Sequence, residues 1–212
     1  MLDRIREHRR DLVTSAVITL AALAVYAIYP ALNHGPRRMF LQTALDRSMP
    51  LVPVMVIPYV SLIPLVLLAA VACGVKGARN YQAYGVALII ALLVSYGFYV
   101  VAQTYVPRPT VTAGGVLKDW LRHVYSLDKP YNDFPSLHTS MSAIIAVSWL
   151  RAHRGSGYVV AAWCAAIIAS TVLIHQHFIA DVAGGLVVAA LALTGADRLV
   201  GRWRPGAEAA LS

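Results

Sequence analysis

The sequence predicts an all-α integral membrane protein. Of its 212 residues, 58% are hydrophobic and only 13% are charged, which is too apolar a composition for a soluble domain. The hydrophobic residues gather in six stretches, each near the length of about 20 residues that crosses the hydrocarbon core of a bilayer. These stretches cover about 12–32, 51–73, 81–106, 135–151, 157–175 and 178–199. The sequence therefore predicts a bundle of six transmembrane helices that forms a single domain over residues 1–212.

The first predicted span follows the charged segment MLDRIREHRR. Its apolar run is longer than the core of a signal peptide and has no small-residue cleavage site before the next charges, so we expect a retained anchor. Prolines interrupt the second span, which follows LDRSMPLVPVMVIPYVS at 45–61. Only two connections, 33–50 and 107–134, are long.

The longer of these connections contains GVLKDWLRHVYSLD at 115–128. Its apolar residues recur at helical spacing with charges between them, which predicts an amphipathic helix at the membrane surface, between the third and fourth spans. Such a helix serves either as a lid over a site or as a structural element on the rim of the bundle.

The distribution of Lys and Arg predicts that both termini are cytoplasmic, because the cytoplasmic side of a membrane protein is usually the more basic. With that orientation the cytoplasmic side holds Arg4, Arg6, Arg9, Arg10, Lys76, Arg79, Arg151, Arg154, Arg198, Arg202 and Arg204. The opposite side holds Arg37, Arg38, Arg47, Arg108, Lys118, Arg122 and Lys129. Because the net charge of +8 is divided between two membrane faces, we expect membrane lipids and no nucleic acid as partners.

Three polar stretches lie at the predicted outer ends of the spans. They are YVPRPTV (105–111), NDFPSLHTS (132–140) and STVLIHQHFIAD (170–181). Polar residues at membrane depth are costly and usually line a cavity within the protein. The topology predicts that all three meet on the extracytoplasmic face, at the ends of the third to sixth helices.

The third stretch contains a histidine and an acid, His177 and Asp181, four residues apart. At a helix start they share one face, where the carboxylate can orient the imidazole and leave its other nitrogen basic. This arrangement suits a nucleophilic histidine, although an ion pair that only stabilises the bundle would have the same spacing.

The second stretch predicts a helix start, with Pro135 in the first turn and Asn132 or Asp133 as the cap. Backbone N–H groups of that turn, with the Ser136 hydroxyl, would form an anion site. His138 in the same turn could protonate a leaving oxygen, or could be an ordinary interfacial imidazole.

The first stretch places Arg108 between Pro107 and Pro109. On such a stiff extended segment the guanidinium would be a fixed fork suited to phosphate oxygens. A lone Arg at the end of a span is also a common topological charge.

Together the stretches resemble the signatures of the type-2 phosphatidic acid phosphatase superfamily, KxxxxxxRP, PSGH and SRxxxxxHxxxD. They read here as VAQTYVPRP (101–109), PSLH (135–138) and STVLIHQHFIAD (170–181). The resemblance implies a lipid phosphatase that works through a phosphohistidine, without a metal or cofactor. It also implies the residue roles: His177 as nucleophile, Asp181 as its orienting acid and His138 as proton donor, with phosphate bound at Arg108, Ser136, Leu137 and Ser170.

The chain departs from these signatures at three positions. Val101 and Thr171 replace a Lys and an Arg that bind phosphate in the family, and Leu137 replaces a Gly. Each unpaired charge in a site of low dielectric constant is costly. We therefore expect either a less highly charged phosphate than phosphatidate or additional cations, for which the outer-loop candidates are Lys118, Arg122 and Lys129.

Two other functions remain open from the sequence. PSLH and the proline-punctuated second span are also similar to the inositol phosphorylceramide synthase branch, which implies transfer of a phospho-headgroup to a lipid hydroxyl. A channel or lipid transporter is a remote alternative, because the inner halves of the spans carry almost no polar residues.

Two minor features have simpler explanations. His175 and His177 are not expected to bind a metal, because no ligand other than Asp181 is predicted nearby. Gly184 and Gly185 are expected to let the sixth helix approach its neighbours closely. The sequence does not determine whether the protein forms a homo-oligomer.

Overall fold

The computed structural model describes residues 2–36, 39–112 and 114–203, and the fold is all-α. Arg37, Arg38 and Arg204, which were counted for the orientation, lie outside the described residues. The helices are α1 (Leu2–Tyr26), α2 (Tyr29–Leu32), α3 (Ala44–Ser48), the 3-10 turn η1 (Pro53–Met55), α4 (Val56–Val60), α5 (Leu62–Lys76), α6 (Ala78–Val101), α7 (Val116–Leu127), α8 (Leu137–Ala152), α9 (Arg154–Leu173) and α10 (Ile179–Trp203).

Within the described ranges, five helical segments are long and apolar enough to cross a membrane, which indicates a multi-pass membrane protein. They are Arg4–Leu32, Pro53–Lys76, Ala78–Val101, Arg154–Leu173 and Ile179–Arg202. Each overlaps one of the six predicted spans.

The remaining prediction, 135–151, falls on α8, which is not among these five segments. Its 16 residues rise about 24 Å at 1.5 Å per residue, less than a hydrocarbon core of about 30 Å. The helix is shorter than predicted at its start because Ser136 is its N-cap and Pro135 lies before it.

The third span is shorter than the predicted 81–106, since α6 ends at Val101. The next residues leave the helix and form two isolated β-bridges, Met39 with Thr104 and Tyr105 with Tyr131. Pro107 and Pro109 follow, and the residue before a proline is disfavoured in a helix. The predicted span therefore extends beyond the last residue of the helix.

The second span consists of η1, α4 and α5 in succession, with Ser61 between the two α-helices. Pro58 and Pro64 lack the backbone N–H that a continuous helix needs, which explains the interruption. This break places Tyr59 of α4 against the site described below.

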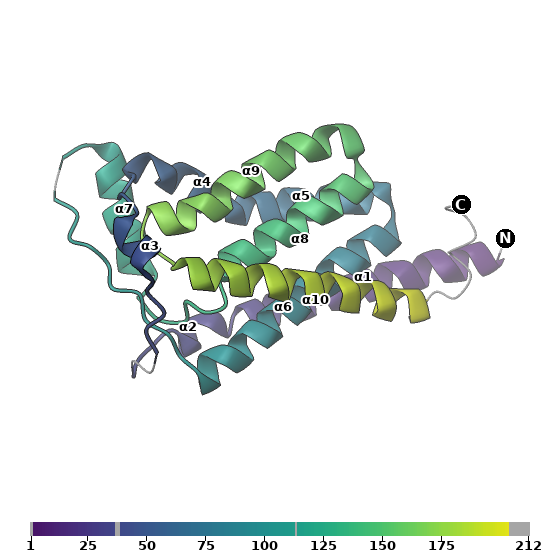
Figure 1. Ribbon diagram of the computed structural model, residues 1–212. Helices are drawn as coiled ribbons and strands as arrows, with labels where there is room; N and C mark the ends of the chain where they lie inside the picture. The colour runs from purple at the N-terminus through teal and green to yellow at the C-terminus, as the bar shows by residue number, and fades with distance from the viewer. Residues whose placement is uncertain (1, 37–38, 113, 204–212) are drawn as a thin grey trace.

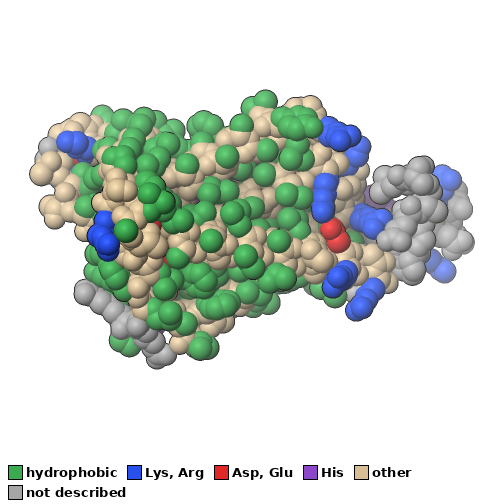
Figure 2. All heavy atoms as spheres, viewed as in Figure 1, with side chains coloured by type: hydrophobic (Ala, Val, Ile, Leu, Met, Phe, Trp, Pro, Cys, Tyr) green, Lys and Arg blue, Asp and Glu red, His purple; other side chains and the backbone are tan. Residues whose placement is uncertain are grey.

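The central helix of the molecule is α8, which packs against α5, α6, α9 and α10 (Figure 1). Its buried face includes Ser140, Ser142 and Ser148 as well as Ile144 and Ile145. By contrast, α1 packs on α6 at the edge of the bundle and leaves most of its apolar side chains exposed. Figure 2 shows a mostly hydrophobic surface between two ends that carry Lys and Arg.

Two glycines allow α10 to approach the start of α8, as expected. A Cβ on Gly185 would lie 2.6 Å from the Ser136 carbonyl oxygen, and one on Gly184 would lie 2.5 Å from the Phe134 ring. The Ser136 N–H also donates to the Asp181 carbonyl at 3.0 Å. The second and third polar stretches are therefore in direct backbone contact.

Candidate functional site

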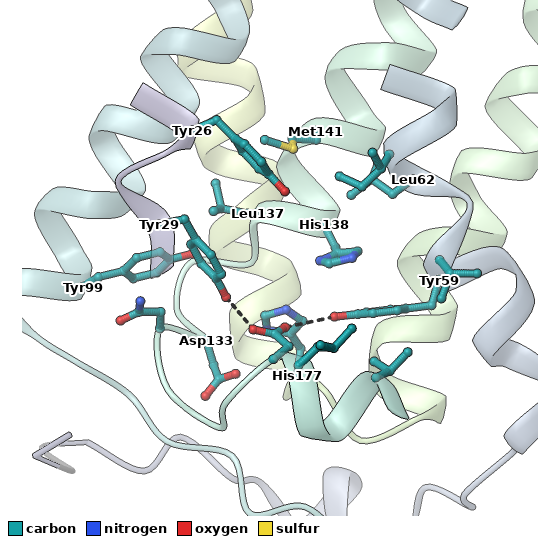
Figure 3. Close-up of a pocket in the computed structure, with 16 residues that line it drawn as sticks. Tyr26, Tyr29, Tyr59, Leu62, Tyr99, Asp133, Leu137, His138, Met141 and His177 are labelled. Carbon is teal, nitrogen blue, oxygen red and sulfur yellow. Dashed lines mark hydrogen bonds between the residues drawn. The ribbon is translucent and has the colours of Figure 1, made fainter. Parts of the chain in front are cut away.

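All three polar stretches lie at the same end of the bundle, beside α3 and α7 (Figure 1). A cavity of about 320 Å³ is lined by residues of the second and third stretches (Figure 3). Its lining consists of Tyr26, Tyr29, Tyr59, Val60, Leu62, Ile63, Tyr99, Val124, Leu127, Asp128, Asn132, Asp133, Leu137, His138, Met141 and His177. Both candidate catalytic histidines thus face one cavity.

A tight turn between α9 and α10 presents His177. The Thr171 carbonyl accepts from the N–H groups of Gln176 and His177, and His175 adopts a φ of 52°. His177 Nδ1 lies 3.6 Å from Asp181 Oδ2, too far for a hydrogen bond, and that oxygen accepts from the Phe178 N–H at 2.8 Å. Asp181 is fully buried, so its carboxylate lies behind the imidazole and away from solvent.

His138 lies in the first turn of α8, on the opposite side of the cavity from the turn that carries His177. The centroids of the two imidazoles are 6.3 Å apart. Tyr59 stacks on His138 with a centroid distance of 4.0 Å and an interplanar angle of 13°. The stacking fixes the orientation of the His138 ring.

The N-cap of α8 is a different residue from the one predicted from the sequence. The Ser136 hydroxyl accepts from the Thr139 N–H at 3.3 Å, so Ser136 is the N-cap and neither Asn132 nor Asp133 is. Leu137 and His138 are the first two residues of the helix, so their N–H groups have no acceptor within it.

The segment before α8 is held by the segment after α6. The Thr104 hydroxyl accepts from the N–H groups of Asp133 and Phe134. Gln103 Nε2 donates to Asn132 Oδ1 at 2.9 Å, and the Tyr99 hydroxyl donates to the Pro135 carbonyl at 2.9 Å. Residues at the end of α6 and within the first signature therefore determine where PSLH lies.

Arg108 bonds to the turn that carries His177. Its Nη1 donates to the carbonyls of His175 at 2.9 Å and Gln176 at 2.7 Å, and its Nη2 lies 3.5 Å from Asp133 Oδ1. Arg108 therefore contacts the backbone directly before His177, the candidate nucleophile, but its side chain does not line the cavity.

Asp133 does line the cavity, and it is almost completely buried. Burial raises the pKa of its carboxyl to about 7, although the Arg108 guanidinium acts in the opposite direction. Asp133 Oδ2 has no hydrogen-bond partner.

The other predicted phosphate positions are arranged differently from one another. Leu137 lines the cavity. Ser170 is fully buried and its hydroxyl donates to the Ile167 carbonyl at 2.6 Å. Ser136 is also fully buried and its oxygen caps α8. Ser136 and Ser170 do not line the cavity, whereas Leu137 and His138 do, and their first-turn N–H groups are free of acceptors within the helix.

A second cavity, of about 370 Å³, reaches His177 from the other side of the turn. It is lined by Gln42, Asp46, Arg47, Val106, Pro107, Val172, His175, His177 and Phe178. Arg47 is exposed and is the only Lys or Arg among the described residues that line either cavity containing His177.

The position of Arg47 follows from three contacts between 46–52 and the turn that carries His177, including its flanking residues. Asp46 Oδ1 accepts from the Ile179 N–H at 2.8 Å. The His175 Nε2 lies 3.2 Å from the Met49 carbonyl, and the Val52 N–H donates to the Leu173 carbonyl at 2.9 Å. Burial raises the pKa of Asp46, but hydrogen bonds from Thr43 and Ile179 lower it below the ordinary value.

Neither cavity is lined by the cations suggested from the sequence, Lys118, Arg122 and Lys129. Arg122 pairs instead with Asp119 on the exposed side of α7. From the sequence, Arg47 was interpreted only as a topological charge. The one local feature that could have indicated its position was the T-x-x-D pattern at Thr43 and Asp46, a capping box that predicts the short helix α3.

The chain belongs to the PAP2 superfamily, whose family model matches residues 37–195. The superfamily predicted from the three signatures is thereby confirmed. Membership indicates a membrane phosphatase or phosphotransferase. No curated protein and no solved structure matches the chain.

Proposed function

We propose that the protein is an integral-membrane lipid phosphatase that hydrolyses a lipid phosphate ester through a phosphohistidine. The observation that carries this proposal is the pairing of His177 and His138 across one cavity, with Asp181 buried 3.6 Å behind His177. A covalent step divides one difficult displacement into two easier ones.

In the first step, His177 Nε2 attacks phosphorus, and the bond from phosphorus to the lipid oxygen breaks as His138 donates a proton to that oxygen. In the second step, His138 accepts a proton from water, which attacks phosphorus and releases His177. Asp181 orients the ring through Nδ1 and stabilises the positive charge that develops on it.

Charge on the transferring group would be stabilised by the first-turn N–H groups of Leu137 and His138 and by the positive end of α8. Arg47 is our candidate for the cation that the family signatures lack here: it does not line the cavity shared by the two histidines, but it lines the second cavity, which His177 also lines. Arg108, Ser136 and Ser170 would then act mainly by positioning backbone and helix ends, as their contacts suggest.

We further propose that α8 completes six crossings, with both termini cytoplasmic and the site on the extracytoplasmic side. In Figure 1 the start of α1 and the end of α10 lie at the end of the bundle opposite α7, which supports an even number of crossings. The strongly amphipathic α7 would lie on the outer membrane surface beside the cavity, since Val124 and Leu127 line it.

The proposal is tested with purified protein and phosphatidate that carries a radiolabelled phosphate. We expect His177→Ala to abolish turnover and the acid-labile label on the enzyme. We expect His138→Ala to lose turnover of phosphatidate but to keep part of its activity on p-nitrophenyl phosphate, whose leaving group needs no proton.

A matched control is His123→Ala, because His123 is an exposed imidazole on α7. It should leave turnover unchanged. Full activity in a folded His177→Ala variant would contradict the mechanism.

Transfer of a phospho-headgroup to a lipid hydroxyl is the second candidate. The specific observation in its favour is that no Lys or Arg of the described chain lines the cavity shared by the histidines, which suits a monoanionic phosphodiester better than a dianionic monoester. Incubation with a diacylglycerol or ceramide acceptor distinguishes the two, because transfer gives a new phospholipid and hydrolysis does not.

A further inference from the structure

The cavity of Figure 3 has a wall of tyrosines that the proposed reaction does not use. Tyr26, Tyr29, Tyr59 and Tyr99 come from four different helices and all line it. Aromatic faces attract cations, and cages of such rings recognise amines and quaternary ammonium groups.

A carboxylate lies at the centre of this wall. Asp128 Oδ1 accepts from the Tyr29 hydroxyl at 2.8 Å and from Asn33 Nδ2 at 2.9 Å, and Oδ2 accepts from the Tyr59 hydroxyl at 3.3 Å. These donors are neutral. Within the described part of the chain Asp128 has no ion pair with a Lys, Arg or His, so its negative charge is hydrogen-bonded but not neutralised.

A second observation points in the same direction. Asp133 and Asn132 line the cavity and are 2% exposed, yet Asp133 Oδ2 and Asn132 Nδ2 have no hydrogen-bond partner. Buried polar atoms without partners are costly. Donors and acceptors are thus available for a polar ligand beside Asp128.

The sign of the charge on that ligand follows from the lining. It contains two carboxylates and, among the described residues, neither Lys nor Arg. A second negative charge on the ligand would be repelled there, whereas a positive group would be attracted by Asp128 and by the aromatic faces.

We propose that this cavity binds the cationic amine headgroup of a zwitterionic phosphodiester lipid, with the ammonium against Asp128 and the tyrosines. This inference rests on the proposed function, because it assigns the substrate class of the same site. The phosphate lies between His138 and His177.

The lipid chains have a route away from the headgroup. An apolar cavity of about 220 Å³ between α1, α5 and α6 shares Tyr26, Ile63 and Met141 with the headgroup cavity. Most of its remaining lining is aliphatic, for example Ala22, Val66 and Leu88, and the lining also includes Thr19, Tyr81 and Tyr84. A chain that extends from the phosphate past Met141 would enter it.

The reaction balances for such a substrate. His177 Nε2 forms a bond to phosphorus, the bond from phosphorus to the diacylglycerol oxygen breaks, and His138 donates the proton that this oxygen needs. Water then attacks phosphorus with loss of a proton to His138, the bond between phosphorus and nitrogen breaks, and a phosphorylated amino alcohol leaves.

The test is a panel of lipids with identical acyl chains, namely phosphatidylcholine, phosphatidylethanolamine, phosphatidylinositol, phosphatidylglycerol and phosphatidate in mixed micelles. We expect the two amine lipids to have the highest kcat/KM. Asp128→Asn should lower kcat/KM for them by about ten-fold or more, since it removes the charge opposite the amine. It should leave turnover of phosphatidate unchanged or raised.

Because Asp128 also joins three elements by hydrogen bonds, thermal unfolding of each variant is recorded, and Tyr26→Leu provides a second variant that leaves those bonds intact. Tetramethylammonium is the probe of binding alone. It should inhibit the wild type competitively, and inhibition should weaken in both variants. Asp119→Asn, an exposed carboxylate change on α7, is the matched control and should behave as the wild type.

A preference for phosphatidylinositol, phosphatidylglycerol or phosphatidate over the amine lipids would overturn the inference and leave the proposed function intact. So would equal inhibition by tetramethylammonium in the wild type and both variants. Absence of any turnover that depends on His177 would overturn the proposed function, and the inference with it.

Discussion

At the scale of single residues, the candidate site has few cations that could bind a phosphate. Arg108, which the resemblance predicts to bind phosphate, donates to the carbonyls of His175 and Gln176 and lies 3.5 Å from Asp133 Oδ1. Its fork is well suited to holding that turn, because its donors have a fixed planar arrangement. Because this turn carries His177, we expect Arg108 to influence the proposed reaction by positioning the turn, without touching phosphate.

Arg47 provides the first prediction. Arg47→Ala should raise KM for a lipid phosphate and weaken inhibition by vanadate by about ten-fold, the usual scale for losing one charge-assisted contact. Arg47→Lys should recover part of the loss, because the charge remains. Both are measured as kcat and KM in mixed micelles.

The control for charge alone is Arg122→Ala, which removes an exposed Arg from the same face of the molecule. It pairs with Asp119 and lines neither cavity that contains His177. If Arg122→Ala and Arg47→Ala weakened vanadate inhibition equally, the effect would come from the general surface potential and not from a phosphate contact.

At the scale of the elements, the site depends on a close approach between α8 and α10. Gly185→Ala places a methyl group 2.6 Å from the Ser136 carbonyl oxygen and 2.8 Å from Thr139 Cβ. Since both neighbours belong to backbone or to a β-branched side chain in a buried turn, we expect a loss of stability of about 1–3 kcal/mol and a larger loss of kcat. The stability is followed by thermal unfolding in detergent.

Gly201→Ala is the matched control on the same helix, because a Cβ there would meet nothing within 4 Å. It should be neutral or slightly stabilising, as alanine favours helices. Equal stability and equal kcat for Gly185→Ala and the wild type would mean that α10 can move away from α8 at no cost to the site.

The helices also show how much of the fold could be predicted from the sequence. The length of the apolar stretches predicted where the long helices lie, because a helix that crosses a bilayer needs such a stretch. It misplaced the end of α6, since the predicted span runs to Val106 although the backbone at Thr104 and Tyr105 already pairs with Met39 and Tyr131. Hydropathy reports the environment of a residue and not its hydrogen bonds.

The signatures singled out the two histidines and Asp181 because these residues are close to one another or to helix starts in the sequence, and the structure brings the three together. Arg47 and Asp128 could not be found in that way. Arg47 reaches the site because Asp46 binds Ile179, and Asp128 is placed by bonds to Tyr29 and Tyr59. These contacts join residues far apart in the chain.

At the scale of the whole molecule, the hydrophobic surface lies between two charged ends (Figure 2), and the site lies at the end that carries α3 and α7. Because α8 leads from that end to the turn with α9 (Figure 1), residues before and after α8 should lie on opposite sides of a membrane. This holds only if α8 crosses despite its 16 residues.

The last prediction tests that crossing with single cysteines and a maleimide that cannot pass the membrane. Ser126→Cys on α7 and Ser48→Cys on α3 should react in intact cells. Ser156→Cys on α9 should react only after permeabilisation. All three positions are exposed, whereas the native Cys73 and Cys164 are buried and give a low background. Reaction of Ser156→Cys from the same side as Ser126→Cys would show that α8 does not cross, and the proposed topology and extracytoplasmic site would then be wrong.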